Sequence, residues 1–343
     1  MMRELLSTTA EVEEMGKRRW LIFFTVMGLT FLVCSPTILL PGTWHEMRIF
    51  AGEHRIGHDS YEFMGQLYRN QMTQWLKGVP WYFYYVFMAV KLPPLTIAAF
   101  VIGLPLLLNK RLGDGRYFIF FWLFYWFFPF PLFGGKFTRY FTMALPVVLI
   151  TAAIGLQFVA QYLSQLISRI IGANISKSYV SLGVALIVLA FSAYASASAT
   201  PYYRLYTNAF GGGTARAGSY FPHDEFYDAS TRETVAVIAL GARPQARVAS
   251  ETPELVAYYA RRAGRNDLVS VSLSNRATIR EFEKGDIIIV ARGRRYFSND
   301  SLVAKLQAVS QPSVNIALGD VPAARVYVLD EISLAVISDL VKS

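Results

Sequence analysis

Five long apolar runs dominate the first 200 residues of this 343-residue chain, and short segments that contain basic residues separate them. A helix that crosses the hydrocarbon core of a bilayer needs about 20 predominantly apolar residues. Only 17% of the residues are charged, against about 25% in soluble globular proteins. We therefore predict five membrane-spanning helices, at about residues 20–40, 92–108, 117–133, 140–162 and 179–199.

The residues after position 200 have the composition of a soluble domain. They contain 17 Lys and Arg and 15 Asp and Glu, whereas residues 1–200 contain 16 and 9. Short apolar segments alternate there with helical patterns, which is typical of a three-layer α/β sandwich with a mostly parallel sheet. Strands are expected at residues 247–250, 268–271, 286–291, 314–317 and 326–329. The predicted fold class is a membrane α-helical bundle (1–200) followed by a small soluble α/β three-layer domain (201–343).

Basic residues set the predicted orientation of the chain in the membrane. Lys17, Arg18 and Arg19 directly precede the first span, and such clusters favour the cytoplasmic side. Five spans from a cytoplasmic N-terminus place residues 201–343 on the other side. We therefore expect an integral membrane protein with an extracytoplasmic C-terminal domain.

The loop between the first two spans, residues 41–81, is expected at the outer membrane face. Apolar residues from Tyr61 onward fall at helical spacing, and Asp59 and Glu62 have the separation of a capping box. Gly78 and Pro80 would end such a helix. We predict an amphipathic helix that rests on the membrane surface.

The net charge of +9 does not indicate a nucleic-acid partner. Seven of these charges lie before residue 201, where Lys and Arg orient helices and contact lipid phosphates. Residues 201–343 contain no aromatic-basic motif of a nucleic-acid-binding protein. The single cysteine, Cys34, excludes an internal disulfide bond. Membrane lipid is the partner that the charge distribution predicts.

Three of the four histidines, His45, His54 and His58, lie in the outer loop. His54 and His58 are four residues apart, a spacing that can place two imidazoles on one helix face for a metal ion. No H-E-x-x-H motif is present, however, and both residues precede the predicted helix. Ordinary surface or capping roles are favoured, with an active-site pocket and a divalent metal site as alternatives, and no cofactor is predicted.

Three basic residues, Lys91, Lys136 and Arg139, map to the outer ends of adjacent predicted spans. Charges at a membrane edge commonly extend toward the lipid headgroups. The alternative is that the three cations converge on a phosphate. Cations that neutralise a lipid-linked phosphate would stabilise it as it departs during glycosyl transfer. The residues alone leave both interpretations open.

A histidine and three carboxylates occur together at His223, Asp224, Glu225 and Asp228. They directly precede a helix that is expected from Ser230, and the helix dipole favours acidic residues at this position. We therefore interpret the cluster as structural. No phosphate-binding loop or dinucleotide-binding fingerprint accompanies it.

Motifs in residues 57–140 follow one another in a recognisable order. They are Gly57-His58-Asp59-Ser60-Tyr61 with Gly65, Val79-Pro80-Trp81-Tyr82-Phe83, Val90-Lys91-Leu92-Pro93, and Gly134-Gly135-Lys136-Phe137-Thr138-Arg139-Tyr140 with Pro146. Over about residues 15–160 the chain resembles the GT-C superfamily of membrane glycosyltransferases. It is most similar to the bacterial branch of the dolichyl-phosphate-mannose–protein mannosyltransferase family, which in turn resembles the lipid A aminoarabinose transferases.

The resemblance implies transfer of a mannosyl or other hexosyl group from a polyprenyl-phosphate donor, at the outer face of a bacterial inner membrane. It implies that Lys91 and Arg139, with Lys136 as a third cation, contact the donor phosphate. It also implies that His58 and Asp59 lie near the sugar pocket, and Asp59 is the only acidic residue inside the matching motifs.

The chain departs from this family in one respect. Such transferases have eight or more spans and carry their catalytic carboxylate in the first outer loop, in the N-terminal half. The chain is therefore expected to be the C-terminal part of a transferase, with a separate N-terminal half as a partner. The resemblance identifies no catalytic residue in this sequence.

Two other functions compete with the transferase. A non-catalytic membrane anchor would present the α/β domain for binding or assembly. A transport subunit would need ionisable residues deep within its spans, whereas the ionisable residues here lie at the predicted span edges. The membrane anchor is therefore the main alternative.

Overall fold

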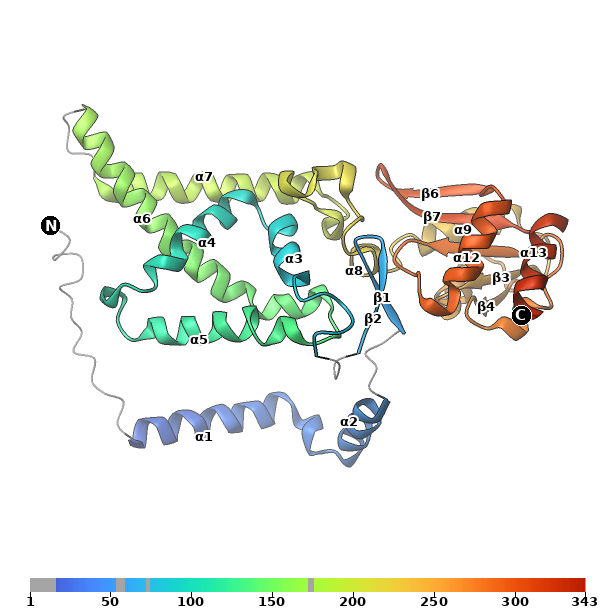
Figure 1. Ribbon diagram of the computed structural model, residues 1–343, viewed down its shortest axis with the longest axis horizontal. Coiled ribbons are helices and arrows are strands. Elements are labelled where there is room, and N and C mark those ends of the chain that lie inside the picture. The colour runs from blue at the N-terminus through green and yellow to red at the C-terminus, as the bar shows by residue number, and fades with distance from the viewer. Residues whose placement is uncertain (1–16, 54–58, 72–74, 172–175, 343) are drawn as a thin grey trace.

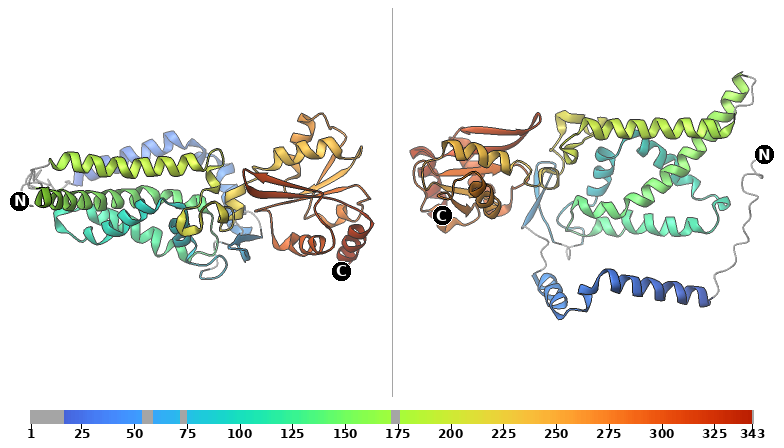
Figure 2. Two further views of the ribbon diagram at one scale, coloured as in Figure 1. Left: turned by 90° about the horizontal axis from the view of Figure 1, so that it is seen from above. Right: turned by 180° about the vertical axis from the view of Figure 1, so that it is seen from behind.

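The structure is a computed structural model that describes residues 17–53, 59–71, 75–171 and 176–342. The molecule is elongated, with the helices of the first 200 residues at one end and the α/β domain at the other (Figures 1 and 2). The N-terminal helices are α1 (Lys17–Cys34), α2 (Pro41–Glu53), α3 (Phe83–Lys91), α4 (Pro94–Leu106), α5 (Gly115–Phe127), α6 (Leu145–Ile171) and α7 (Lys177–Ser198).

Within the described ranges, two helices, α6 and α7, are long and apolar enough to cross a membrane. The predicted five-span bundle is therefore wrong. The apolar part of α1 is Leu21–Cys34, and α4 and α5 have 13 residues each. A helix of that length extends only about 20 Å, which is short of a hydrocarbon core of about 30 Å.

Proline residues explain why the apolar runs at α1, α4 and α5 do not form longer helices. Proline lacks a backbone N–H and disfavours helical geometry in the residue before it. Pro36 follows the end of α1, Pro93 is the residue before α4, and Pro129 follows α5. A hydropathy pattern averages across these breaks, so it overestimates the length of each helix.

Two glycines allow α4 and α6 to pack closely. A Cβ atom at Gly103 would collide with the backbone carbonyl of Thr151, and one at Gly155 would collide with that of Ala99. Small residues permit this close approach between helices in membranes. By contrast, only 6% of the most apolar window of α7 is buried, so most of this helix presents apolar side chains outward.

A β-hairpin occupies the place of the predicted amphipathic helix. Strands β1 (Ser60–Phe63) and β2 (Gln66–Arg69) pair antiparallel. Met64 and Gly65 connect them with φ angles of 51° and 82°, as a two-residue hairpin turn requires. Tyr61 and Phe63 are both 1% exposed, so the buried positions follow a strand period of two. The helix and its capping box are therefore wrong.

The α/β domain contains a five-stranded sheet with the order β4-β3-β5-β7-β6. Strands β3, β4 and β5 are parallel, whereas β7 pairs antiparallel with both β5 and β6. The sheet is thus mixed rather than mostly parallel, because β6 and β7 form a hairpin. The helices and strands of the domain are α9 (Thr231–Gly241), β3 (Arg247–Ser250), α10 (Pro253–Arg262), β4 (Val269–Ser272), α11 (Arg276–Ile279), β5 (Ile287–Ala291), α12 (Phe297–Val309), β6 (Val314–Leu318), β7 (Val321–Val328) and α13 (Glu331–Lys342).

Helices cover both faces of the sheet. Val235 of α9 and Val256 of α10 share a hydrophobic cluster with Val248 and Ile287 of the strands. On the other face, α11, α12 and α13 pack over residues such as Ile288. Each strand that lies between two helical layers is apolar on both sides, which explains the nearly continuous apolar run in β5.

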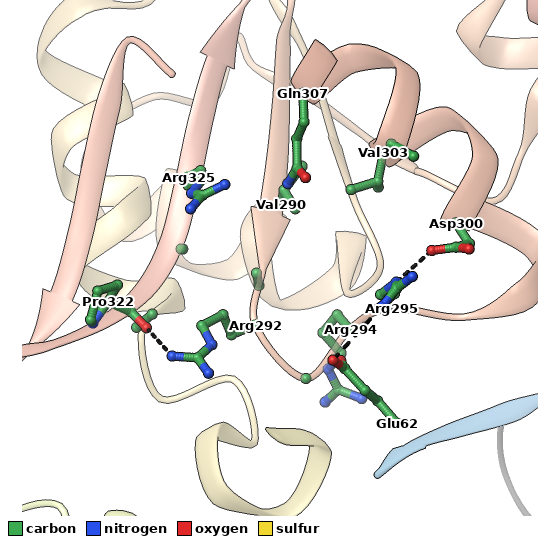
Figure 3. A pocket seen from close by; sticks show the side chains of 15 residues that line it. Glu62, Val290, Arg292, Arg294, Arg295, Asp300, Val303, Gln307, Pro322 and Arg325 are labelled. Atoms are coloured by element: carbon green, nitrogen blue, oxygen red, sulfur yellow. Dashed lines mark hydrogen bonds and ion pairs between the residues drawn. The ribbon is translucent and has the colours of Figure 1, made fainter. Parts of the chain in front are cut away.

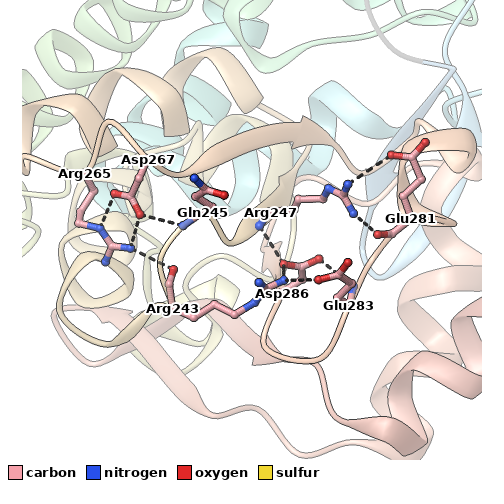
Figure 4. Close-up of polar contacts among 8 residues, drawn as sticks. All are labelled: Arg243, Gln245, Arg247, Arg265, Asp267, Glu281, Glu283 and Asp286. Atoms are coloured by element: carbon pink, nitrogen blue, oxygen red, sulfur yellow. Dashed lines mark hydrogen bonds and ion pairs between the residues drawn. The ribbon is translucent and has the colours of Figure 1, made fainter.

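A buried aspartate joins β3 and β5 at the amino-terminal ends of these parallel strands. The carboxylate of Asp286 accepts hydrogen bonds from the backbone N–H of Arg247, at 2.9 Å, and from the guanidinium of Arg243, at 2.7 Å (Figure 4). The backbone N–H of Glu283 donates a third, also at 2.9 Å. These contacts offset the cost of burying a carboxylate. At the opposite end of the sheet, residues that follow β5 contact the N-terminal part of the chain, where the guanidinium of Arg295 donates to the backbone carbonyl of Gly65 at 3.2 Å.

Candidate functional site

A cleft of about 440 Å³ opens where the N-terminal helices meet the segment that leads into the α/β domain. Its volume lies within the range of small-molecule sites. The lining comes from α3, from the 3₁₀ helix η4 (Thr138–Met143) and from residues 203–227. We call it the basic cleft. It is lined by Phe87, Lys91, Thr138, Arg139, Thr142, Tyr203, Arg204, Tyr206, Phe221, Asp224, Glu225 and Tyr227.

Lys91 is the last residue of α3 and lines one wall of the basic cleft. Its ammonium forms an ion pair with Glu225 and donates to the backbone carbonyls of Arg204, at 3.0 Å, and Tyr206, at 2.6 Å. Burial lowers the pKa of Lys91, and the charge of Glu225 opposes that shift. An ammonium has three donors, so all of them are used within the protein.

Two neighbouring carboxylates complete this wall. Glu225 also accepts a hydrogen bond from the backbone N–H of Phe221, at 2.9 Å. Asp224 accepts from the hydroxyl of Tyr61, at 2.8 Å, and from the backbone N–H of Thr138, at 2.7 Å. Both carboxylates belong to α8 (Pro222–Phe226). They join α8 to β1 of the hairpin, to α3 and to η4.

Arg139 and Arg204 differ from Lys91 because their charged groups are exposed. The guanidinium carbon of Arg139 lies 4.4 Å from the ring centroid of Phe137, and that of Arg204 lies 4.7 Å from the ring centroid of Tyr227. Neither side chain forms a hydrogen bond or an ion pair with another described residue. Aromatic rings thus position two guanidinium groups whose N–H donors are available to a ligand.

Lys136 does not line the basic cleft. Its ammonium is buried and donates to the backbone carbonyls of Val79, at 2.7 Å, and of Phe133. Burial lowers the pKa of Lys136 to about 8. The structure therefore brings Lys91 and Arg139 to one cleft, as the phosphate hypothesis expects, and leaves the third predicted cation elsewhere.

The structure does not place the residues expected near a sugar pocket in the basic cleft. His58, like His54, lies outside the described residues, while His45 lies on α2. Asp59 contacts the first turn of α12, where it accepts from the backbone N–H groups of Phe297, at 3.2 Å, and Ser298, at 3.0 Å. Asp59 is therefore a remote cap for α12, and it does not line the basic cleft.

No group of three or more His, Cys, Asp and Glu residues that could hold a metal ion occurs within the described part of the chain. The cluster at residues 223–228 instead makes structural contacts. His223 is 7% exposed and contacts the carbonyl of Gly293 at 3.2 Å. Asp228 forms an ion pair with Arg294 of the α/β domain. This agrees with its interpretation as structural.

Arg204 is the functional candidate that sequence reasoning missed. It lies shortly after the last predicted span, which ends at about residue 199, and has tyrosines near it at positions 202, 203 and 206. An aromatic-basic segment is typical of a membrane edge. That pattern predicts a position near headgroups, but only the structure shows that Arg204 faces the same cleft as Arg139.

Comparisons of the chain with protein-family models, with curated proteins and with solved structures return no match. The fold and the site define the class of protein instead. The described residues of the chain form an apolar helical part with two helices of membrane-spanning length, and a mixed α/β domain follows it. A basic cleft lies at the junction.

Proposed function

We propose that the chain is part of a membrane glycosyltransferase and that its basic cleft binds the phosphate of a polyprenyl-phosphate-linked sugar. The observation that carries this proposal is the presence of two exposed guanidinium groups, Arg139 and Arg204, in one cleft at the end of apolar helices. The planar fork of arginine matches the geometry of a phosphate. The motif resemblance supports the same chemistry, with the cleft at the outer face of a bacterial inner membrane.

Charge stabilisation is the chemical role of the two arginines. In glycosyl transfer the bond between the anomeric carbon and the phosphate oxygen breaks, and the acceptor oxygen forms a new bond to that carbon. The departing polyprenyl phosphate gains negative charge, which preorganised guanidinium groups stabilise. Arg139 and Arg204 would bind this phosphate, and the proposal assigns no base in this chain to the acceptor proton.

Lys91 acts as a positioning residue in this account. Its three donors hold Glu225 and the carbonyls at residues 204 and 206, so it fixes the backbone from which Arg204 projects. The family resemblance implied that Lys91 itself contacts phosphate. The hydrogen bonds favour Arg204 for that contact.

A second function is favoured by a specific observation. Lys91, Asp224 and Glu225 all have partners inside the protein, and these two acidic residues are the ones that line the basic cleft. Charged groups that are already bound within the protein have a structural role, as expected of a non-catalytic membrane anchor that presents the α/β domain. The transferase and the anchor make opposite predictions about donor turnover.

Donor turnover tests the proposal in membranes of the source cells, with polyprenyl-phosphate mannose as the donor. We expect release of polyprenyl phosphate to fall about tenfold or more in Arg139→Ala and in Arg204→Ala, because each loses a charged hydrogen bond. Arg169→Ala is the matched control, since Arg169 is an exposed arginine in the last turn of α6. Release that depends on the chain but is unchanged in both cleft variants would contradict the phosphate site. An absence of chain-dependent release would favour the anchor.

A further inference from the structure

A second cavity, of about 490 Å³, lies in the α/β domain beside the end of β5. One wall is α12, which contributes Asp300, Val303 and Gln307, and the floor is formed by β5 and β7 (Figure 3). Four arginines line it, at positions 292, 294, 295 and 325. We call this cavity the arginine groove. It shares no lining residue with the basic cleft.

The sheet topology explains why the groove is open. Arg325 of β7 lies directly across from Val290 of β5 in the antiparallel register. Helix α12 packs over β5 and its neighbours through Leu302, Val303 and Leu306, whereas the side chain of Arg325 is exposed. The groove therefore runs between α12 and the part of the sheet that this helix leaves uncovered.

Two of the four arginines are already neutralised by carboxylates. Arg295 forms an ion pair with Asp300, and Glu62 of β1 lies 4.0 Å from its guanidinium. Arg294 forms an ion pair with Asp228. The acidic residues of the groove, Glu62 and Asp300, are therefore both held by Arg295, at one end of the groove.

The other two arginines, Arg292 and Arg325, pair with no carboxylate among the described residues. Arg292 donates only to backbone carbonyls, those of Gly218, at 2.7 Å, and Pro322, at 3.3 Å. Arg325 makes no hydrogen bond to another described residue. Burial lowers the pKa of Arg292, the negative charges of Glu62 and Glu225 oppose that shift, and the positive charge of Arg325 adds to it. Both side chains line the arginine groove.

We propose that the arginine groove binds a phosphate group between Arg292 and Arg325. An anion in this position would accept charge-assisted hydrogen bonds from two guanidinium groups that have no carboxylate ion-pair partner among the described residues. The exposed amide of Gln307 adds a neutral hydrogen-bond donor in the same groove. The volume accommodates a phosphorylated small molecule or the headgroup of an anionic phospholipid. This inference does not depend on the proposed transferase function.

Titration calorimetry of the full chain in an uncharged detergent tests this site. One arm uses glycerol 3-phosphate as the probe, and the other uses vesicles of phosphatidylcholine with and without phosphatidylglycerol. All titrations are made in the Arg139→Ala/Arg204→Ala background, so that the basic cleft does not contribute. A soluble phosphate ester is the ligand class if the first probe binds, and a lipid headgroup is the class if only phosphatidylglycerol vesicles bind.

Arg325→Ala is the informative variant, because its exposed side chain forms no hydrogen bond or ion pair with another described residue and the fold should persist. We expect saturable binding that weakens about tenfold or more in Arg325→Ala. The matched control is Arg261→Ala, an exposed arginine on α10, which covers the opposite face of the sheet, and it should bind like its parent. Absence of saturable binding of both probes would overturn the proposal. So would equal affinity of Arg325→Ala and its parent, or an equal loss in Arg261→Ala.

Discussion

Burial decides which basic side chains of this protein can bind a ligand. Lys91 and Lys136 donate to backbone carbonyls inside the protein, whereas Arg139 and Arg204 keep exposed guanidinium groups. The sequence placed Lys91, Lys136 and Arg139 in one group because all three flank apolar runs. It could not separate them, since the carbonyls that bind Lys91 belong to residues more than 100 positions away.

Lys136 gives a prediction about the pH dependence of stability. Its pKa is lowered to about 8 in the folded protein, so at higher pH the unfolded chain binds more protons than the folded chain. The free energy of unfolding should therefore rise with pH between about 8 and 10.5, by up to about 1.4 kcal/mol per pH unit from this residue. Below pH 8 the ammonium is charged in both states, and this gain is absent.

Denaturant unfolding in detergent micelles at pH 7 to 10.5 measures this effect. Lys136→Met should lose the rise, while Lys77→Met, at an exposed lysine in the same region, should keep it. Parallel pH profiles for Lys136→Met and the wild type would show that Lys136 is not the titrating group.

At the scale of elements, the α/β domain was the most predictable part of the chain. Its strands are short apolar segments bounded by turns, so their positions at β3, β4 and β5 follow from pattern alone. The pairing of β7 was not predictable, because apolar runs do not show strand direction.

The hairpin at β1 and β2 was mistaken for a helix. Apolar residues there fit a helical spacing, but Met64 adopts a φ of 51°, which a helix excludes.

Helix α12 depends on a residue from the other part of the molecule. Asp59 accepts from the backbone N–H groups of Phe297 and Ser298, which an isolated α/β domain would leave without this partner. Asp59→Ala should lower the free energy of unfolding by about 1 kcal/mol, as for the loss of an N-cap. It should also speed hydrogen exchange of amides in the first turn of α12.

Hydrogen exchange followed by mass spectrometry resolves this turn from the rest of the domain. Asp320→Ala is the control, since Asp320 is exposed in the turn between β6 and β7. If Asp59→Ala and Asp320→Ala exchange at the same rate in α12, the contact does not stabilise that helix.

At the scale of the whole molecule, the junction between the two parts is the feature that the sequence did not reveal. Phe221 is fully buried in the same hydrophobic cluster as Phe83 of α3. Asp224 reaches Tyr61 across 163 residues, and Glu225 reaches Lys91 across 134. Local patterns cannot predict such pairs. The same limit applies to the apolar helical part, where proline breaks leave α6 and α7 as the helices long and apolar enough to cross a membrane within the described chain.

The basic cleft is proposed to recognise a lipid-linked phosphate through Arg139 and Arg204. Equilibrium binding of polyprenyl phosphate and of polyprenol, which lacks the phosphate, to the purified full chain tests this proposal. Every protein carries Arg325→Ala, so that the arginine groove does not contribute. We predict that the Arg325→Ala parent and its Arg169→Ala derivative prefer polyprenyl phosphate by about tenfold or more, and that the derivative with Arg139→Ala and Arg204→Ala binds the two lipids equally. Equal binding of both lipids by the parent, or a preference that survives when both cleft arginines are replaced, would contradict the phosphate site.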